Sequence, residues 1–332
     1  MKALTPTLLT LCAELSQQVA SAPPNGSIYT RERDGTCYYY VKMPVGMIRV
    51  DSFIGKMGDP AAEEAVESLR RGMNLARDRR KLVTILKKEG IAAPHRTIGA
   101  TLDAIAQSGL FRAGAVLVGT GAYMMCEPLV GHFLPRPTLM TGDLDLATAN
   151  LALAADPPEA FEDILKRGDP TFRSVMHLDP RNPPSRFSTG DGFLVDLIAP
   201  KRRGTDTNPV HVKALHAGAA PLQHINWLIT DPVQTVALWG AGVAVKVPQP
   251  ARFAVHKLIL AQKRNPIMRL KRQKDLAQAD ALIEALLAND PYALEDAIED
   301  ARAKGRKGWE VPIERSLAEV GRRTSDYSKV AS

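Results

Sequence analysis

The hydrophobic pattern between residues 115 and 147 changes twice, and each change predicts a different element. Residues 115–118 form a short apolar run, which is typical of a buried strand. Residues 119–121 (Gly-Thr-Gly) then predict a sharp turn, and residues 122–129 predict a helix with those glycines at its N-terminus. Residues 143–147 alternate acidic and apolar side chains, which predicts a second strand with one polar and one apolar face.

Three acidic residues on predicted strands are the strongest candidates for chemistry. Asp143 and Asp145 lie two residues apart, so their carboxylates point to the same strand face and repel each other unless a cation lies between them. Hard oxygen ligands at this spacing suit Mg²⁺ or Mn²⁺. Asp196 lies inside the apolar run 192–199, where a lone carboxylate is costly unless it is paired or bound to a metal.

The pattern before this core predicts an N-terminal module over residues 1–92. A short amphipathic helix is expected over 6–20, a small three-stranded antiparallel meander over 27–55, and a long basic helix over 59–89. Breakers at residues 90 and 94 then place the boundary to the next domain.

The pattern after this boundary predicts a core domain over residues 93–248 and a helical region over 249–332. Together with the N-terminal module they predict an α+β fold in which helices flank a mixed sheet. Further strands are expected at 172–177, 224–229, 235–239 and 243–247, and further helices at 97–108, 157–166, 252–264, 268–288, from 290 onward and at 309–320.

Composition excludes several classes of protein. The chain is 45% apolar and 24% charged, as in an ordinary globular protein, and its net charge of +7 favours an anionic partner such as a nucleotide or RNA. Three cysteines without a CxxC pair argue against a disulfide framework or a zinc site and for a reducing compartment, so we expect a cytoplasmic protein. No segment approaches the roughly 18 uninterrupted apolar residues of a membrane span, so no membrane partner is expected.

The meander has two interpretations. Arg31, Arg33, Lys42 and Arg49 are interleaved with the tyrosines at 38–40, a mixture that favours a nucleic-acid surface. The same pattern also fits an antiparallel sheet with one face exposed to water, which is the favoured interpretation.

The order of the motifs resembles the DNA polymerase β-like nucleotidyltransferase superfamily. The pattern of that superfamily is a hydrophobic residue and Gly with a small residue, then Asp-x-Asp, then a distant Asp. Val118-Gly119-Thr120, Asp143-Leu144-Asp145 and Asp196 match it, with Thr120 where Ser is usual. The segment 96–131 is similar to a bacterial group of uncharacterised nucleotidyltransferase-like proteins related to abortive-infection and toxin–antitoxin nucleotidyltransferases. The resemblance covers roughly residues 95–290 and implies the nucleotidyltransferase fold.

The resemblance also implies roles for individual residues. It makes Asp143, Asp145 and Asp196 the ligands of Mg²⁺ or Mn²⁺, with Asp196 as a further proton acceptor. It places Gly119, Thr120 and Gly121 at the phosphates of a bound NTP, and it assigns Lys257 to the triphosphate as a catalytic residue. Asp275, preceded by Lys274 where the family has Arg, is expected to orient Lys257 or a motif residue and so to support nucleotide binding. Lys257 is expected at the edge of its helix, pointing into the cleft, so that Lys257→Ala leaves the fold intact.

The implied reaction is Mg²⁺-dependent transfer of a nucleoside monophosphate from an NTP to a hydroxyl group. In the superfamily two metal ions support this step. The net charge favours RNA, such as tRNA, as the acceptor, in a toxin-like role with an antitoxin protein as a further partner. Two alternatives stay open: a toxin that transfers AMP to a protein, and a catalytically inactive nucleic-acid-binding module.

Overall fold

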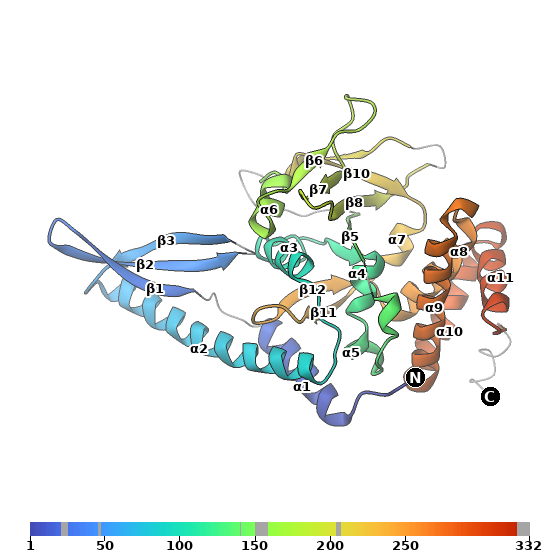
Figure 1. The fold of residues 1–332 in the computed structure, drawn as a ribbon, viewed down its shortest axis with the longest axis horizontal. Coiled ribbons are helices and arrows are strands. Elements are labelled where there is room, and N and C mark those ends of the chain that lie inside the picture. Colours follow the sequence, from blue (N-terminus) through green and yellow to red (C-terminus); the bar gives the residue numbers. More distant parts are fainter. Residues whose placement is uncertain (21–25, 46–47, 140, 150–158, 204–206, 324–332) are drawn as a thin grey trace.

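The fold is α+β, as predicted, and helices flank a mixed sheet (Figure 1). A small sheet lies at one end of the molecule and a group of C-terminal helices lies at the other, with the larger mixed sheet above the region between them (Figure 1). This computed structural model describes residues 1–20, 26–45, 48–139, 141–149, 159–203 and 207–323.

The central sheet is built from β4 (Val116–Val118), β5 (Asp143–Ala147), β6 (Arg173–Val175), β7 (Arg186–Ser188), β8 (Leu194–Pro200), β9 (Val210–Val212) and β10 (Ala217–Leu222). Its main path runs β4-β5-β8-β10-β9. β8 is parallel to both β5 and β10, whereas β4 is antiparallel to β5. β7 pairs with the first half of β8 and also with β6, so a hairpin of two short strands extends the sheet there.

The register of these strands brings the acidic residues together. Asp145 lies opposite Asp196 on the parallel strands β5 and β8, and Arg186 lies opposite Asp196 on the antiparallel strands β7 and β8. Residues directly opposite on paired strands point to the same face of a sheet. Asp143 shares that face because it is two residues from Asp145, whereas Leu144 between them is buried in the main hydrophobic core.

A hairpin of β11 (Val233–Ala237) and β12 (Val243–Val247) forms a second, two-stranded sheet. The helix α3 (Arg96–Gln107) packs near it at close range: a Cβ on Gly99 would lie 2.4 Å from the ring of Trp239. Only glycine therefore fits at this contact.

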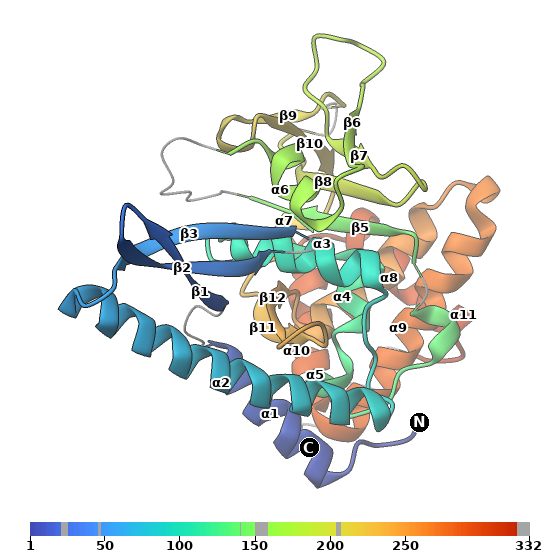
Figure 2. The same cartoon turned by 60° about the vertical axis from the view of Figure 1, so that its left-hand side comes forward.

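The N-terminal segment has the predicted elements, namely α1 (Pro6–Ala20), β1 (Ser27–Arg33), β2 (Thr36–Val45), β3 (Ile48–Lys56) and α2 (Pro60–Lys88). The Asp59 carboxylate accepts a hydrogen bond from the amide of Ala61 (3.1 Å), so Asp59 caps α2 as its position before Pro60 predicts. One face of the meander β1–β3 packs on α2 through Tyr39, Ala62 and Val66, and α2 runs along this face in Figure 2.

A small hydrophobic cluster joins the N-terminal segment to the rest of the chain. α1 and the end of α2 contribute Leu8, Leu15 and Leu86, and the β11–β12 region contributes Val236 and Leu238. The division into 1–92, 93–248 and 249–332 stays a prediction, although this cluster crosses its first boundary.

Within the described residues 249–323, the C-terminal region consists of four helices and two short turns, close to the predicted positions. They are α8 (Pro250–Lys263), the 3₁₀ turn η3 (Pro266–Met268), α9 (Arg269–Asn289), α10 (Pro291–Ala303), the π-helical turn η4 (Arg306–Glu310) and α11 (Val311–Glu319). α8 and α9 lie side by side (Figures 1 and 2) and bury Phe253, Leu258 and Leu282 in the main core.

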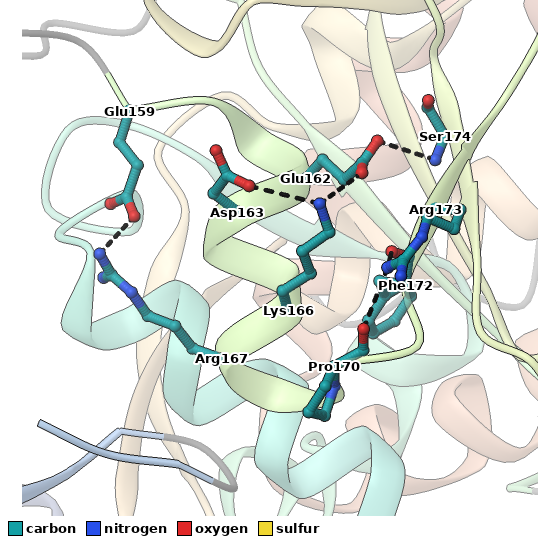
Figure 3. A network of polar contacts seen from close by, with 9 residues as sticks. All are labelled: Glu159, Glu162, Asp163, Lys166, Arg167, Pro170, Phe172, Arg173 and Ser174. Carbon is teal, nitrogen blue, oxygen red and sulfur yellow. Dashed lines mark hydrogen bonds and ion pairs between the residues drawn. The ribbon is translucent and has the colours of Figure 1, made fainter.

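The helix α6 (Phe161–Gly168) anchors the β6–β7 hairpin. Glu162 accepts a hydrogen bond from the backbone amide of Ser174 (3.0 Å) on β6, and Lys166 forms an ion pair with Glu162 (2.6 Å; Figure 3). Since β7 lies between β6 and β8, this network helps to fix the strand that carries Arg186. The first part of the predicted helix 157–166 lies outside the described residues.

Two predicted elements were wrong in type or extent. Residues 224–229 are not a strand: α7 (Ile225–Leu228) occupies them, and β10 comes earlier, in the small-residue run Ala217–Leu222. A short apolar run does not distinguish helix from strand. The predicted helix 122–129 is two short helices, α4 (Gly119–Met124) and α5 (Glu127–Val130), because Pro128 has no N–H to donate to the carbonyl of Met124, four residues earlier. The remaining turns are η1 (Arg136–Thr138) and η2 (Lys213–Leu215).

Candidate active site

A cavity of about 530 Å³ lies between the polar face of the central sheet and helices α8 and α9. The loop from β4 to α4 forms part of its wall through Val118, Gly119 and Thr120. Its acidic lining residues are Asp143, Asp145, Asp196 and Asp275, and its basic lining residues are Arg186, Lys201, Lys257, Lys263, Arg264, Lys271 and Lys274. A cavity with an acidic cluster on one wall and an excess of cations around it suits a polyanion that carries a divalent ion.

Gly119 makes room for Asp145. Gly119 has a φ of +64°, a left-handed conformation that favours glycine, and a Cβ at this position would lie 2.1 Å from Oδ2 of Asp145. The first glycine of the Gly-Thr-Gly turn is therefore required by the carboxylate that packs against the loop. The two motifs that the sequence separates by more than twenty residues form one contact.

Asp145 has a strongly raised pKa. Burial, and then the negative charges of Asp143 and Asp196, raise the pKa of Asp145 to about 6. Lys257 and Lys271 oppose this rise but do not cancel it. Asp143 is oriented by the hydroxyl of Thr141, which donates a hydrogen bond to its carboxylate. Excess negative charge at this point of the cavity is the feature that a bound cation relieves.

Asp196 has a cationic partner that the sequence analysis did not identify. Arg186 Nε donates to Asp196 Oδ1 and Arg186 Nη2 donates to Asp196 Oδ2, both at 2.7 Å. This is a two-pronged ion pair, the strongest geometry between these groups. The expectation that the Asp196 carboxylate must be paired or metal-bound is thus met by Arg186.

Lys257 is buried rather than placed at the edge of α8 as expected. Its ammonium donates to Asp275 Oδ1 (2.7 Å), and Arg264 Nε donates to Asp275 Oδ2 (2.8 Å). The Lys257 side chain is only 7% exposed and that of Asp275 only 4%. The contact agrees with the expectation that Asp275 orients Lys257. The structure does not test the intact fold expected after Lys257→Ala, but this change would break a buried ion pair, so we now expect a loss of stability.

A family model described as Nucleotidyltransferase matches residues 96–303. The chain belongs to the nucleotidyltransferase family. The match begins at the first residue of α3 and ends at the last residue of α10, so it includes every charged residue named above as lining the cavity. No curated protein and no solved structure matches the chain. Within the described residues, no helix combines the length and the apolar character that crossing a membrane requires.

The fit of the carboxylates of this nucleotidyltransferase to a metal ion is uneven. Asp143 and Asp145 point to one face, and the pKa of Asp145 is raised first by burial and then by the negative charges of Asp143 and Asp196, so this pair fits a divalent cation. Asp196 fits less well as a third ligand, because Arg186 balances its charge and uses one lone pair of each of its oxygens. In the part of the chain that the structure describes, no group of three His, Cys, Asp or Glu side chains is arranged to hold a metal ion.

The other predicted nucleotide-binding residues divide into two groups. Thr120 and Lys274 line the cavity, and Thr120 Oγ1 lies 3.5 Å from the buried Gln278 Nε2 of α9. Gly121 is not among the cavity-lining residues: it is buried in α4, where a Cβ would lie 2.7 Å from a methyl group of Leu144. The close packing of α4 on β5 therefore explains why residue 121 is a glycine.

Arg186 and Lys271 line the cavity of the nucleotidyltransferase but were missed from the sequence. The signal for Arg186 was present: Asp191-Gly192 is a hairpin signal, and Arg186 and Asp196 lie five residues before and five after Asp191. Antiparallel strands around that turn bring the two opposite each other, as observed. No sequence pattern distinguishes Lys271, because α9 contains several basic residues. Only the packing of α9 on the rest of the fold brings Lys271 close to Asp145.

Proposed function

We propose that the protein transfers a nucleoside monophosphate from an NTP to a hydroxyl acceptor in a Mg²⁺-dependent reaction. The observation that carries this proposal is the pair Asp143 and Asp145, packed against Gly119 and surrounded by lysines in one cavity. The motif order resembles that of the DNA polymerase β-like superfamily and its abortive-infection and toxin–antitoxin members, which supports the same reaction.

Each group of residues has a role in this proposal. Asp143 and Asp145 would hold Mg²⁺ or Mn²⁺, which supplies Lewis-acid neutralisation of the triphosphate when bound. Lys271 and Lys274 face the carboxylates from α9 and would contact the triphosphate, and Lys257, held by Asp275, adds positive charge from behind them. The Thr120 hydroxyl, which lines the cavity, would donate to a phosphate oxygen.

The transfer step breaks the phosphoanhydride bond between the α- and β-phosphates and forms a phosphoester bond to the acceptor. The acceptor oxygen bonds to the α-phosphorus while the bond to pyrophosphate breaks, and pyrophosphate leaves with its charge balanced by the lysines. Asp196 would take the acceptor proton through a lone pair beyond the two that accept from Arg186. A reaction in line across the α-phosphorus needs the acceptor on the side of the cavity away from the lysines of α9.

RNA, such as tRNA, is the acceptor that the surroundings of the cavity favour. A shallower cleft of about 340 Å³ adjoins the cavity and shares four lining residues with it: Lys201, Gln223, His224 and Lys263. All charged residues among those that line this cleft are cationic, and Trp309 adds an aromatic wall. Cations next to an aromatic ring suit a phosphate backbone with exposed bases. A toxin-like role in the cytoplasm with an antitoxin partner is part of the same proposal.

The meander provides the observation that favours the alternative, a nucleic-acid-binding module without activity. On its face away from α2, Tyr29 and Tyr40 stack at 5.6 Å, and the Arg31 guanidinium lies 5.3 and 5.4 Å from the two ring centres. Stacked aromatic rings with a cation can bind unpaired bases. The transfer experiment below distinguishes this alternative from the enzyme.

The test is incubation of the pure protein and Mg²⁺ with each of the four α-labelled NTPs, first with total RNA and then with total protein. Label should enter RNA and release pyrophosphate, and Asp143→Asn should abolish the transfer while Asp163→Asn, at an exposed carboxylate of α6, should not. Label in protein instead would establish the AMP-transferring alternative. RNA binding without any transfer would establish the inactive module.

A further inference from the structure

The pairing of Arg186 with Asp196 changes the charge balance of the active site. Three carboxylates, Asp143, Asp145 and Asp196, line the sheet side of the cavity, and the Arg186 guanidinium neutralises one of them at 2.7 Å. Two negative charges remain, which is the charge of one divalent ion. A second divalent ion would place excess positive charge among carboxylates that already have an arginine partner.

The position of the guanidinium is set by the sheet. Arg186 is the first residue of β7 and lies opposite Asp196 in the ladder with β8. β7 is held on its other side by β6, which the α6 network fixes through Glu162 and Ser174 (Figure 3). A side chain delivered by paired strands is placed more precisely than one on a loop.

A two-metal site needs a carboxylate that both ions share, with the ions about 3.5–4 Å apart. In the superfamily pattern the third acid, here Asp196, is the ligand that completes such a site. Each oxygen of Asp196 instead accepts one N–H of Arg186, and the described residues contain no group of three acidic, His or Cys side chains arranged around a single point. With Arg186 paired to it, the charge of Asp196 is already balanced without an ion.

We propose that Arg186 replaces one of the two metal ions, so that the protein binds a single divalent ion through Asp143 and Asp145. This single-ion proposal rests on the proposed function, in which Asp143 and Asp145 hold the metal ion. A guanidinium has five N–H donors, of which Asp196 uses two. The Arg186 side chain is 52% exposed and lines the cavity, so its remaining donors are available to a substrate phosphate oxygen. Arg186 thereby both positions Asp196 and supplies a fixed positive charge at the reacting phosphate.

The test is the number of Mn²⁺ ions bound per chain, measured by electron paramagnetic resonance during titration of the protein with Mn²⁺ alone. The wild type should bind about one ion with an uncoupled spectrum. Arg186→Gln should bind about two ions with the spin coupling of metals roughly 4 Å apart. Arg186→Gln combined with Asp196→Asn should return to one ion. Arg186→Lys should also stay at one, because an ammonium keeps the positive charge beside Asp196.

A matched control is Arg181→Gln, since Arg181 also forms a two-pronged pair, with Asp179, but is largely exposed and does not line the cavity. The Arg181→Gln variant should still bind about one Mn²⁺ ion per chain. Two coupled ions in the wild type, one ion in folded Arg186→Gln, or no Mn²⁺ on the wild type would each overturn the proposal. The count is separate from the reaction: a protein that binds one Mn²⁺ but transfers nothing contradicts only the proposed function.

Discussion

Two clusters of charged residues line the cavity, and they are built in opposite ways. On the helical side, Asp275 has two cationic partners, Lys257 and Arg264, and is almost fully buried. On the sheet side, three carboxylates have one close cationic partner, Arg186, which is half exposed. The first cluster has an excess of cations in direct contact and the second has an excess of anions.

The pKa values follow this difference. Burial alone would raise the pKa of Asp275, but Lys257 and Arg264 outweigh burial and hold that pKa below its usual value. Burial, together with the neighbouring charges of Asp143 and Asp196, raises the pKa of Asp145 to about 6. The fold therefore stabilises the ionised form of Asp275, whereas it destabilises the ionised form of Asp145 unless a cation binds next to it. Perturbation of this second kind is typical of functional sites.

The largest expected effect is on the stability of the helical cluster. Asp275→Asn leaves Lys257 buried without an anion, so the free energy of unfolding should fall by about 3–5 kcal/mol, measured by urea denaturation. Asp280→Asn is the matched control, because Asp280 lies on the same helix, pairs with Arg322 and is 38% exposed. That change should cost under about 1 kcal/mol. Equal losses in the two variants would show that the Asp275 cluster does not stabilise the fold.

Removing one cation from the same cluster should have a smaller effect than removing its anion. Lys257→Ala leaves Asp275 with Arg264 alone and should lower the unfolding free energy by about 3 kcal/mol. Lys257→Met keeps the apolar stem and should recover part of this loss. If both variants are as stable as the wild type in urea, Lys257 acts on the substrate without supporting the fold.

The structure explains why the sequence predicted one cluster better than the other. The Gly119 and Asp143–Asp145 motifs are local, so their spacing placed them on a turn and a strand. The burial of Lys257 depends on the packing of α9 against α8. Nine residues of α8 are buried, and they lie around more than one side of the helix, so the sequence does not show where an apolar face ends and an exposed edge begins. The pairing of Arg186 with Asp196 depends on strand register, which spacing indicates only once the hairpin is assumed.

Removing the space that Gly119 leaves for Asp145 should have an effect of intermediate size on the acidic cluster. Gly119→Ala puts an alanine into a left-handed conformation that disfavours it. Its Cβ would lie 2.1 Å from Oδ2 of Asp145, so the carboxylate must move. The transfer rate should fall by about 10², with a loss of about 1–2 kcal/mol in stability. Gly142→Ala, next to Asp143 with no atom within 4 Å of its added Cβ, should change neither. Similar rates for the two variants would mean that the position of Asp145 is not critical.

The smallest expected effect is a pH dependence of stability that has opposite signs for the two clusters. The folded protein keeps a proton on Asp145 up to about pH 6, whereas the unfolded chain loses it near pH 3.8, so this group contributes less stability as the pH rises through that window. Asp145→Asn removes the penalty, and its gain in melting temperature over the wild type should be larger at about pH 7 than at about pH 4. Mg²⁺ should reduce this gain by stabilising the wild type.

Asp275 contributes in the other direction, because its pKa is lowered in the folded state. The stability that it provides is complete above the unfolded pKa of about 3.8 and is lost as the pH falls through the lower folded value. The difference between wild type and Asp275→Asn should therefore be constant from about pH 5 to about pH 7. A gain for Asp145→Asn that does not change with pH would contradict the assignment of its raised pKa.

The central claim is that the acidic cluster serves the reaction and the helical cluster serves the fold. It is tested most directly by measuring nucleotide transfer from an α-labelled NTP and unfolding free energy on the same preparations of Asp145→Asn and Asp275→Asn. We predict that Asp145→Asn loses transfer by about 10³ and is at least as stable as the wild type at neutral pH, whereas Asp275→Asn loses about 3–5 kcal/mol of stability. An Asp145→Asn variant that is folded and transfers at the wild-type rate would contradict the account.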